Sequence, residues 1–314
     1  MAQLIAAAGT SHAFALRGPS EWDEVRINNE KGYERLYGAP PEPRPELDQE
    51  TDEDLRYRYG FISRGQDAIR DRFAAAKLDA LIILGDDQNE GFTEQTFLPQ
   101  LAIYTGKSFK TRAGTQYRCA SDLALHLYER TVDAGFEVTG CGGFPDDILR
   151  AHAIGPVLDR LTPEADVRII PIFVEAIHVP SPSPTRCYAF GLALAEAIEA
   201  WPGNERIGVV ASGGISHRTQ SYPYKHAPNA RYGTIDHEYD RHLFALMAEG
   251  RGAELGKLSN QDLLDHGDPE LHGWITLLGM VGDRKMEQLA YEPFYRAIMA
   301  MGVGYWDLAP ALTR

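Results

Sequence analysis

The chain has 314 residues, of which 44% are hydrophobic and 10% aromatic, and its formal net charge is -14. This composition is typical of a globular protein that buries a large core, as one domain or as two closely joined halves. The acidic balance argues against binding to nucleic acid or to an anionic membrane, because both need basic surface patches. Small molecules are therefore the expected ligands.

The sequence also bears on the cellular compartment. No apolar run approaches the roughly 20 residues that a membrane span needs, and the first residues lack the basic start and long apolar block of a secretory signal. We therefore expect a cytoplasmic protein. Cys119, Cys141 and Cys187 are odd in number and show no CxxC spacing. They are expected to be reduced thiols rather than parts of a disulfide framework or a zinc site.

A polar, Pro-rich and acidic segment at 17–59 follows the first apolar run. Its composition favours disorder. It also carries Trp22, Tyr33, Leu36 and Tyr37, which give it apolar surface to pack, so a lid or a partner-binding arm fits equally well. Both interpretations stay open at this point.

Strand and helix patterns alternate along the rest of the chain. Short apolar or β-prone runs predict strands at 81–84, 136–139, 168–174 and 207–211. Apolar residues at helical spacing predict helices at 61–76, 121–135, 146–161, about 184–201, about 234–248 and over the region 258–281. The helix at 146–161 is expected to bend near Gly155-Pro156. The alternation predicts an α/β fold, a three-layer α/β/α sandwich with a central mixed, largely parallel sheet.

Polar residues follow several of the predicted strands directly. The run LIILGDDQNEGF at 81–92 passes from apolar residues to acids and amides, while 4–12 and 209–217 each end in a histidine and 173–178 ends in Glu and His. Ligands of open α/β sheets bind at the carboxyl ends of the strands, because the following loops converge there. We expect these four ends to build one site.

The sequence SGGISH at 212–217 allows more than one function. Glycines let backbone amides approach an anion, but the motif lacks the lysine and the spacing of a P-loop. It also fits a tight turn with a solvated histidine. A histidine on a rigid turn at a strand end is well placed for proton transfer near neutral pH, and this favours His217 and, by the same reasoning, His12.

Charged residues gather on the predicted helix at 234–248. Glu238 and His242 share a helical face and could form a metal pair, although an exposed pair four residues apart is the more common outcome. His152, taken alone, fits a surface or structurally satisfied histidine. Arg186 and Arg218 lie near the proposed strand ends, where they could pair with a substrate carboxylate or remain ordinary surface charges.

Six motifs together resemble a known family. TSHA at 10–13, GDDQNEGF at 85–92, His152 followed by GPVL, RCYAFG at 186–191, SGGISH and IDHEYD at 235–240 occur in the order seen in LigB-type, class III extradiol ring-cleavage dioxygenases, and LHGWI at 271–275 fits as well. The likeness covers most of the chain and is greatest to relatives that act on gallate, methylgallate and dihydroxyphenylpropionate. It implies one LigB-like catalytic domain over 1–314, with 17–59 as an insertion.

The resemblance implies a mononuclear Fe(II) held by two histidines and one glutamate. Carried onto this sequence, it assigns His12 and Glu238 as metal ligands, His217 as the acid/base and His152 as a histidine on the substrate side. The position of the second histidine ligand holds Gln88, whose amide oxygen is a harder and weaker donor to Fe(II) than imidazole.

Three alternatives follow from this departure: Gln88 ligates, Glu90 ligates in its place, or a stable iron site is lost.

The function implied by the resemblance is Fe(II)-dependent, extradiol-type opening of a dihydroxylated aromatic ring with O2. Catechol, protocatechuate and gallate are the implied kinds of substrate, and a homo-oligomer, dimer or higher, is expected. Two other functions fit the altered ligand at Gln88. One is hydrolysis or decarboxylation of an aromatic acid at a changed or absent metal site, and the other is a non-catalytic partner subunit.

Overall fold

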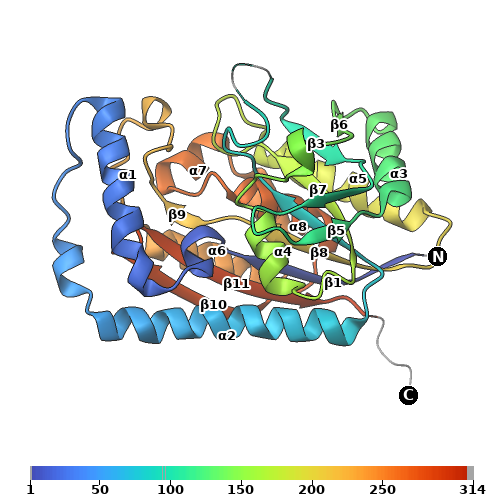
Figure 1. Cartoon of the computed structure of the whole chain (residues 1–314), viewed down its shortest axis with the longest axis horizontal. Coiled ribbons are helices and arrows are strands. Elements are labelled where there is room, and N and C mark those ends of the chain that lie inside the picture. The colour runs from blue at the N-terminus through green and yellow to red at the C-terminus, as the bar shows by residue number, and fades with distance from the viewer. Residues whose placement is uncertain (1, 94, 96, 310–314) are drawn as a thin grey trace.

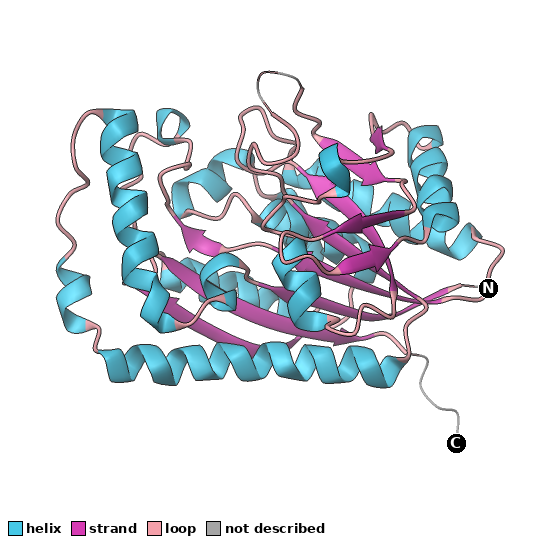
Figure 2. Cartoon of the chain, in the orientation of Figure 1, coloured by secondary structure: helices cyan, strands magenta, loops and turns pink. Residues whose placement is uncertain are grey.

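The computed structural model describes residues 2–93, 95 and 97–309, and a sheet runs through the centre of this structure (Figures 1 and 2). Within the described residues nine strands form it, in the order β10-β11-β1-β8-β2-β7-β3-β6, with β9 paired to β11. Helices cover both faces, so the predicted three-layer α/β/α arrangement and the mixed, largely parallel sheet are confirmed.

Four parallel strands form the middle of the sheet, and they are listed in spatial order: β1 (Gln3–Thr10), β8 (Arg206–Ser212), β2 (Ala80–Gly85) and β7 (Arg168–Val174). Their residues are almost continuously buried, as expected for parallel strands covered on both faces. Because these strands run in one direction, the loops after β1, β2 and β8 meet at the same edge. This edge positions the site described below.

Strands joined by antiparallel pairing extend the sheet on each side. On one side lie β3 (Leu101–Tyr104), antiparallel to β7, and β6 (Thr139–Cys141). On the other lie β11 (Met299–Asp307), β10 (Glu287–Phe294) and β9 (Ile215–His217), all joined by antiparallel pairing. A separate hairpin is formed by β4 (Ser108–Lys110) and β5 (Gln116–Arg118).

One face of the sheet is covered by α3 (Ser121–Asp133), α5 (Pro184–Ala200), α6 (His237–Glu249) and α8 (Leu271–Val281). The pair α5 and α8 packs backbone against backbone. A Cβ on Gly191 would lie 2.0 Å from the carbonyl oxygen of Thr276, and one on Gly279 would lie 2.1 Å from that of Tyr188. Two glycines therefore fix how closely α8 approaches, and α8 begins at the site.

The opposite face is covered by α2 (Asp52–Ala76) and α4 (Gly155–Leu161), with α1 (Trp22–Tyr37) crossing near one end of α2 (Figure 1). Trp22 is fully buried and its indole nitrogen donates to the carbonyl oxygens of Phe14 and Arg17. In the segment 17–59 the structure thus has a packed helix and the short 3-10 helices Pro19–Glu21 and Pro45–Gln49, where the sequence left disorder open.

Several elements differ from their predicted bounds. The helix predicted at 61–76 starts nine residues earlier, at Asp52, because Thr51 and Asp54 form a capping box. The helix predicted at 146–161 shrinks to α4 after a short 3-10 helix at Pro145–Asp147, since Pro156 occupies the first turn of a new helix. The strand predicted at 136–139 begins only at Thr139, its last predicted residue.

The region 258–281 divides into α7 (Asn260–His266) and α8, following a 3-10 helix at Gly252–Lys257. Gly267 ends α7 in the left-handed conformation, with φ +93°, and Pro269 prevents the helix from continuing. Another short 3-10 helix, Tyr224–His226, and one at Ala13–Leu16 complete the helical elements that the structure describes.

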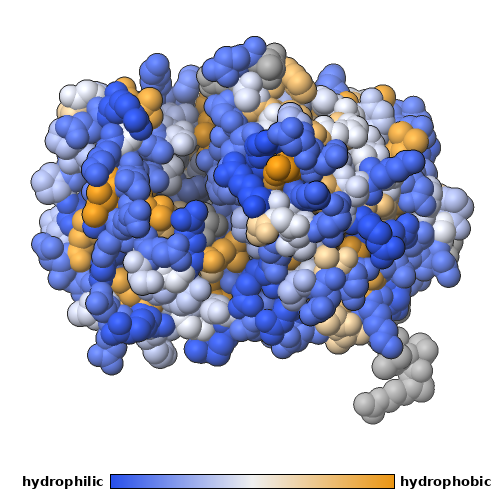
Figure 3. Space-filling model, viewed as in Figure 1, coloured by the Kyte–Doolittle hydropathy of each residue, from blue (hydrophilic) through white to orange (hydrophobic). Residues whose placement is uncertain are grey.

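The visible surface in Figure 3 is largely hydrophilic, with hydrophobic residues scattered over it. No helix among the described residues is both long and apolar enough to cross a membrane.

Candidate active site at the carboxyl edge of the sheet

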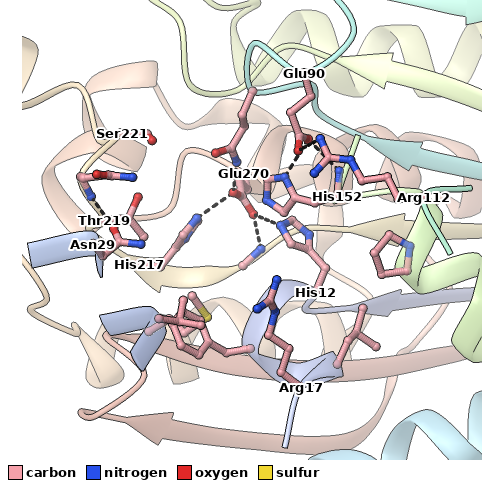
Figure 4. A pocket seen from close by; sticks show the side chains of 18 residues that line it. His12, Arg17, Asn29, Glu90, Arg112, His152, His217, Thr219, Ser221 and Glu270 are labelled. Atoms are coloured by element: carbon pink, nitrogen blue, oxygen red, sulfur yellow. Dashed lines mark hydrogen bonds and ion pairs between the residues drawn. The ribbon is translucent and has the colours of Figure 1, made fainter. Parts of the chain in front are cut away.

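A cavity of about 370 Å³ lies at the ends of β1, β2 and β9 (Figure 4). Its volume is within the range of small-molecule sites. Polar and charged side chains predominate on its inner wall, where His12, His152, His217 and Glu270 point toward one another (Figure 4). Apolar groups from Phe14, Leu16, Val25, Pro156 and Met299 complete the lining.

His12 follows β1 and is buried. Its Nδ1 lies 3.0 Å from the hydroxyl of Ser212 at the end of β8, and its Nε2 lies 3.5 Å from Oε2 of Glu270. Burial lowers the pKa of His12 to about 4, despite the opposing effect of Glu270. The imidazole is therefore neutral near pH 7, the form in which histidine binds a metal ion.

Glu270 enters the cavity from the break between α7 and α8. It is the N-cap residue of α8, but its side chain makes no capping bond and instead accepts hydrogen bonds from the site. His217 Nε2 lies 2.7 Å from Oε1, and the backbone amide of Gly214 donates to Oε2. Burial alone would raise the pKa of this carboxyl, but His217 and His12 hold it well below its usual range. Glu270 is thus a buried carboxylate.

The turn from β8 to β9 holds His217 in place. A Cβ on Gly214 would lie 2.8 Å from Nδ1 of His217, and one on Gly213 would lie 2.7 Å from the carbonyl oxygen of Glu270. The backbone amide of His217 donates to the carbonyl of Gly267 at 2.9 Å. These glycines therefore serve close packing around His217 and Glu270, which accounts for the SGGISH motif without a phosphate. Although burial opposes it, Glu270 raises the pKa of His217.

The loop after β2 carries four polar side chains, of which those of Gln88 and Glu90 line the cavity. Asp87 stabilises the loop itself, because its carboxylate accepts from the backbone amides of Glu90, Gly91 and Phe92 at 2.9 to 3.1 Å. Asp86 is buried, and the amide nitrogen of Gln88 donates to it and to Glu270. Burial, then the charge of Glu270, raise the pKa of Asp86 well above its usual range.

His152 lies in the turn before α4 and forms an ion pair with Glu90. Its backbone amide and its Nδ1 contact Oε2 of Glu90 at 2.7 and 2.8 Å, and Arg112 donates to the other oxygen at 2.8 Å. Burial would lower the pKa of His152, but Glu90 outweighs it and raises this pKa to about 9. The ring of His152 meets that of His12 edge to face, with centroids 4.9 Å apart.

A metal ion would find one set of donors here. Among the residues that the structure describes, His12, Asp86 and Glu270 each offer a ligand atom, and these atoms lie within 4.8 Å of one another. All three side chains are buried.

Glu238, assigned as the carboxylate ligand from the resemblance, does not reach the cavity. It lies in the first turn of α6 with its side chain exposed, because Leu243, Phe244 and Met247 form the buried side of that helix. The structure therefore corrects this assignment: the carboxylate beside His12 belongs to Glu270. Sequence reasoning missed Glu270, although it directly precedes the LHGWI motif, since a single acid after a proline has no periodic signal.

Two predicted substrate-binding residues also lie outside the cavity lining. Arg186 forms an ion pair with Glu137 and stacks over the ring of Phe136. Arg218 is buried, where its guanidinium donates to backbone or side-chain oxygens of Thr234 and Asp265. Both cations are thus engaged in the fold rather than turned toward a ligand.

The other predicted residues do come together. His12, His152, His217, Gln88 and Glu90 all line the cavity. Glu90 is fully occupied by His152 and Arg112, and Gln88 presents its amide nitrogen to two carboxylates. Asp86, Arg17 and Arg112 were not singled out from the sequence, since acids and arginines in loops are common without a function.

Comparison with known proteins gives the following matches. A 52-residue stretch is 42% identical to a gallate dioxygenase of Pseudomonas putida, but it spans only 17% of this chain and 15% of that enzyme. A crystal structure of an uncharacterized protein from Escherichia coli K12 covers 96% of this chain and 99% of its own, with 12% identity and a TM-score of 0.48. The family described as the catalytic LigB subunit of aromatic ring-opening dioxygenase matches residues 51–304. The chain therefore belongs to the LigB family of aromatic ring-opening dioxygenases.

Proposed function

We propose that this protein is an Fe(II)-dependent extradiol-type dioxygenase that opens a dihydroxylated aromatic ring with O2. The observation that carries the proposal is the buried grouping of neutral His12 and ionised Glu270, flanked by His217 and His152, in a cavity of about 370 Å³. His12 and Glu270 can thus hold a cation, and the neighbouring His217 and His152 can exchange a proton with, or donate a hydrogen bond to, a ring substrate.

The residues present fit a divalent cation. Oδ1 of Asp86 is buried with no hydrogen-bond partner among the described residues, and it lies in the same cluster as His12 and Glu270. Two carboxylates so close together are unfavourable in a buried site unless a positive charge accompanies them. His12 and Glu270 would hold the ion. Bound Fe(II) would supply the redox chemistry through which O2 reacts with the ring.

His217 is the proposed acid/base. Its Nδ1 is covered by Gly214, so Nε2, which faces Glu270, is the nitrogen that would exchange protons at the site. Nε2 donates to the ionised Glu270 in this structure, so this bond would have to open when Glu270 holds a cation; Nε2 would then accept a phenolic proton from the substrate and return one as the ring opens. Before that, the pairing with Glu270 holds the imidazole in place.

His152 is proposed to bind the substrate. Because Nδ1 is occupied by Glu90, Nε2 is the nitrogen left for a ligand. With a pKa of about 9, His152 is protonated near neutral pH, so Nε2 would donate a hydrogen bond to a substrate oxygen. Glu90 positions His152, and Arg112 positions Glu90.

The reaction balances without another reductant. Both atoms of O2 enter the product, one bond of the ring beside the hydroxyl pair breaks, and the ring itself supplies the electrons that reduce O2. No residue of the chain changes oxidation state. A requirement for NADH or another reductant would therefore argue against this type of reaction.

An aromatic acid is the proposed substrate class. Arg17 lines the cavity and points into it (Figure 4), and its guanidinium has no hydrogen-bond or ion-pair partner among the described residues. A carboxylate on the ring would pair with it. The segment 17–59, predicted as a lid or an arm, contributes Val25 and Asn29 of α1 to the cavity wall, which supports a role as lid.

Arg17→Gln tests the substrate class. We expect the KM for protocatechuate and gallate to rise about 10-fold, the loss of one charge-assisted hydrogen bond, while the KM for catechol stays unchanged. Steady-state O2 uptake measures both values. An equal rise for catechol would show that Arg17 acts on the cavity as a whole and would remove it as the carboxylate partner.

The proposed activity is tested by anaerobic reconstitution with Fe(II), followed by O2 uptake with catechol, protocatechuate, gallate and their methyl ethers. Mass spectrometry of the product formed under ¹⁸O2 should show two labelled oxygens. Iron-loaded protein that consumes no O2 with any of these rings would overturn the proposal. Release of CO2 from the aromatic acids without O2 would instead support the decarboxylase alternative.

The expected homo-oligomer and cytoplasmic location stay predictions. Light scattering after size-exclusion chromatography measures the first: a molar mass near 34.9 kDa, that of a single chain, would contradict it.

A further inference from the structure

The position at which the family resemblance expects a second imidazole holds Gln88, and its amide bridges two carboxylates. Nε2 donates to Oδ2 of Asp86 at 3.0 Å and to Oε1 of Glu270 at 2.8 Å. The orientation of the amide is dictated by chemistry, because both neighbours are acceptors and only the NH2 group has two hydrogens to give. Gln88 therefore acts as a donor at this site.

The bridge leaves one oxygen of Asp86 free. Oδ2 takes the bond from Gln88, while Oδ1 is buried and has no hydrogen-bond partner among the described residues. The exposed fraction of Asp86 is 4%. An unpartnered carboxylate oxygen in a buried site is unfavourable, and a second carboxylate nearby increases the electrostatic strain. A proton or a cation at this oxygen would relieve the strain.

His12 and Glu270, the other two residues of this cluster, each have one atom available to an ion. Ser212 occupies Nδ1 of His12, which leaves Nε2 facing Oε2 of Glu270 at 3.5 Å. Gln88 and His217 both contact Oε1 of Glu270, while among the described residues Oε2 accepts a hydrogen bond from the backbone amide of Gly214 and lies near Nε2 of His12. One nitrogen and two carboxylate oxygens thus remain for an ion, consistent with the 4.8 Å cluster of His12, Asp86 and Glu270.

We propose that His12, Asp86 and Glu270 form the protein ligands of the metal ion, and that Gln88 is a positioning residue that holds the two carboxylates together. The inference rests on the proposed function only in placing a divalent cation at this site. Two carboxylates balance the charge of such an ion. The set contains one nitrogen instead of two, so it is harder than a site with two imidazoles and also suits Mn²⁺.

We therefore expect substitutions at Asp86 and at Gln88 to weaken metal binding to different extents. Removing the carboxylate at Asp86 deletes a ligand, whereas removing the amide at Gln88 only frees the two carboxylates to separate. Loss of an outer partner typically weakens metal binding roughly 10- to 100-fold. The effect at Asp86 should exceed the effect at Gln88.

The test uses the metal-free full chain titrated with Mn²⁺, with free Mn²⁺ followed by electron paramagnetic resonance. Asp86→Asn should weaken binding by at least about 100-fold and Gln88→Leu by roughly 10- to 100-fold. Glu238→Gln, which removes an exposed carboxylate from α6, is the matched control and should bind like the parent. Thermal unfolding of each metal-free variant checks that it is folded.

A second measurement does not depend on the variants. Electron spin-echo spectroscopy of the Mn²⁺-loaded parent counts the imidazole nitrogens bound to the ion, and we expect one. Two coupled nitrogens would overturn the inference, as would parent-like Mn²⁺ affinity in Asp86→Asn.

The outcomes also separate this inference from the proposed activity. If Asp86→Asn keeps full metal affinity and Fe(II)-dependent O2 uptake, the proposed ligands are contradicted while the dioxygenase function is supported. If metal binding depends on Asp86 and Gln88 as expected but no ring is opened, the proposed ligands are supported and the function is contradicted. A parent that binds neither Mn²⁺ nor Fe(II) would overturn both.

Discussion

Two histidine–carboxylate pairs of equal length lie in different parts of this molecule. His217 and Glu270 are 2.7 Å apart at the start of α8, and His266 and Asp236 are 2.7 Å apart at the start of α6. The first pair has side-chain exposures of 7% and 1%, and the second has 37% and 36%. Glu270 accepts further bonds from the site, while Asp236 caps α6 through the amide of Tyr239.

The two pairs have equal distances but different exposure, so distance alone does not identify a functional pair. Solvent screens the exposed pair, so it contributes roughly 0–1 kcal/mol to stability and little else. The buried pair cannot be solvated, so its charges depend on their neighbours and respond strongly to a ligand or an ion. The start of α8 therefore has the buried, interacting charges expected of the proposed site, and the start of α6 has the solvent-exposed charges of an ordinary helix terminus.

The largest expected difference is between the two glutamates that begin these helices. Glu270→Gln should abolish Fe(II) retention and lower turnover by more than about 10³-fold, because the stabilisation supplied by a metal is worth several kcal/mol. Glu238→Gln should change neither the Fe(II) retention nor the turnover. Iron content and O2 uptake of the reconstituted proteins measure both effects. Loss of iron in the Glu238 variant alone would reverse the comparison and restore the assignment made from the sequence.

The histidines provide the next comparison. His217→Gln should retain iron while turnover falls about 10²- to 10⁴-fold, the usual contribution of a positioned acid/base. His242→Gln, which alters an exposed position on α6, serves as the control and should behave like the parent. Normal turnover in the His217 variant would exclude this residue from proton transfer.

Much of this arrangement was predictable from local sequence patterns. The predicted bounds of the buried strands at 81–84, 168–174 and 207–211 agree with the observed bounds within one residue at each end. A short continuous apolar run is typical of a strand that is buried on both faces. The edge at which His12 and His217 meet followed from the direction of parallel strands. The catalytic roles of these residues stay predictions.

The remainder depended on contacts between distant segments. The hairpin of β10 and β11 was not predicted, and its pairing with β1 and β9 is set by residues far apart in the chain. Glu270 reaches the cavity only because the helical region breaks at Gly267 and Pro269. Likewise, the side chain of Asp86 lies beside His12 and Glu270, while that of Asp87 binds the loop backbone. No periodic sequence pattern distinguishes these two neighbouring aspartates.

A third test concerns a pair of intermediate exposure, His152 with Glu90, whose side chains are 32% and 15% exposed. Glu90→Gln should lower kcat/KM roughly 10- to 100-fold, as for other residues that orient a ligand-binding group, with most of the change in KM. Glu137→Gln, which removes the exposed partner of Arg186, should have no effect. If both variants match the parent, the orientation of His152 does not depend on Glu90.

The smallest effect is expected at Asp236. Burial would raise the pKa of this carboxyl, but His266 and the amide of Tyr239 lower it below its usual range. A depressed carboxyl pKa contributes stability above the usual pKa, and this contribution is lost as the pH falls through the folded-state pKa. Asp236→Asn should therefore be less stable at pH 6 by under about 1 kcal/mol, with the difference shrinking toward pH 3.

Urea unfolding of the parent and the Asp236→Asn variant across this pH range measures that difference. Turnover at pH 7 should be unchanged. A large loss of stability, or a difference that grows on acidification, would show that the exposed pair is more tightly coupled to the fold than its surroundings suggest.

The central position of β1 has a consequence for how the protein is made. β1 pairs with β8 and β11, so roughly two hundred residues must be synthesised before its first partner exists. At ~5–20 residues per second this takes roughly 10–40 s, during which an apolar strand has no sheet to join. The histidine that follows β1 meets the carboxylate of Glu270 later still. On the proposed function, metal loading must therefore follow folding, and nascent chains stalled before β8 should not retain iron.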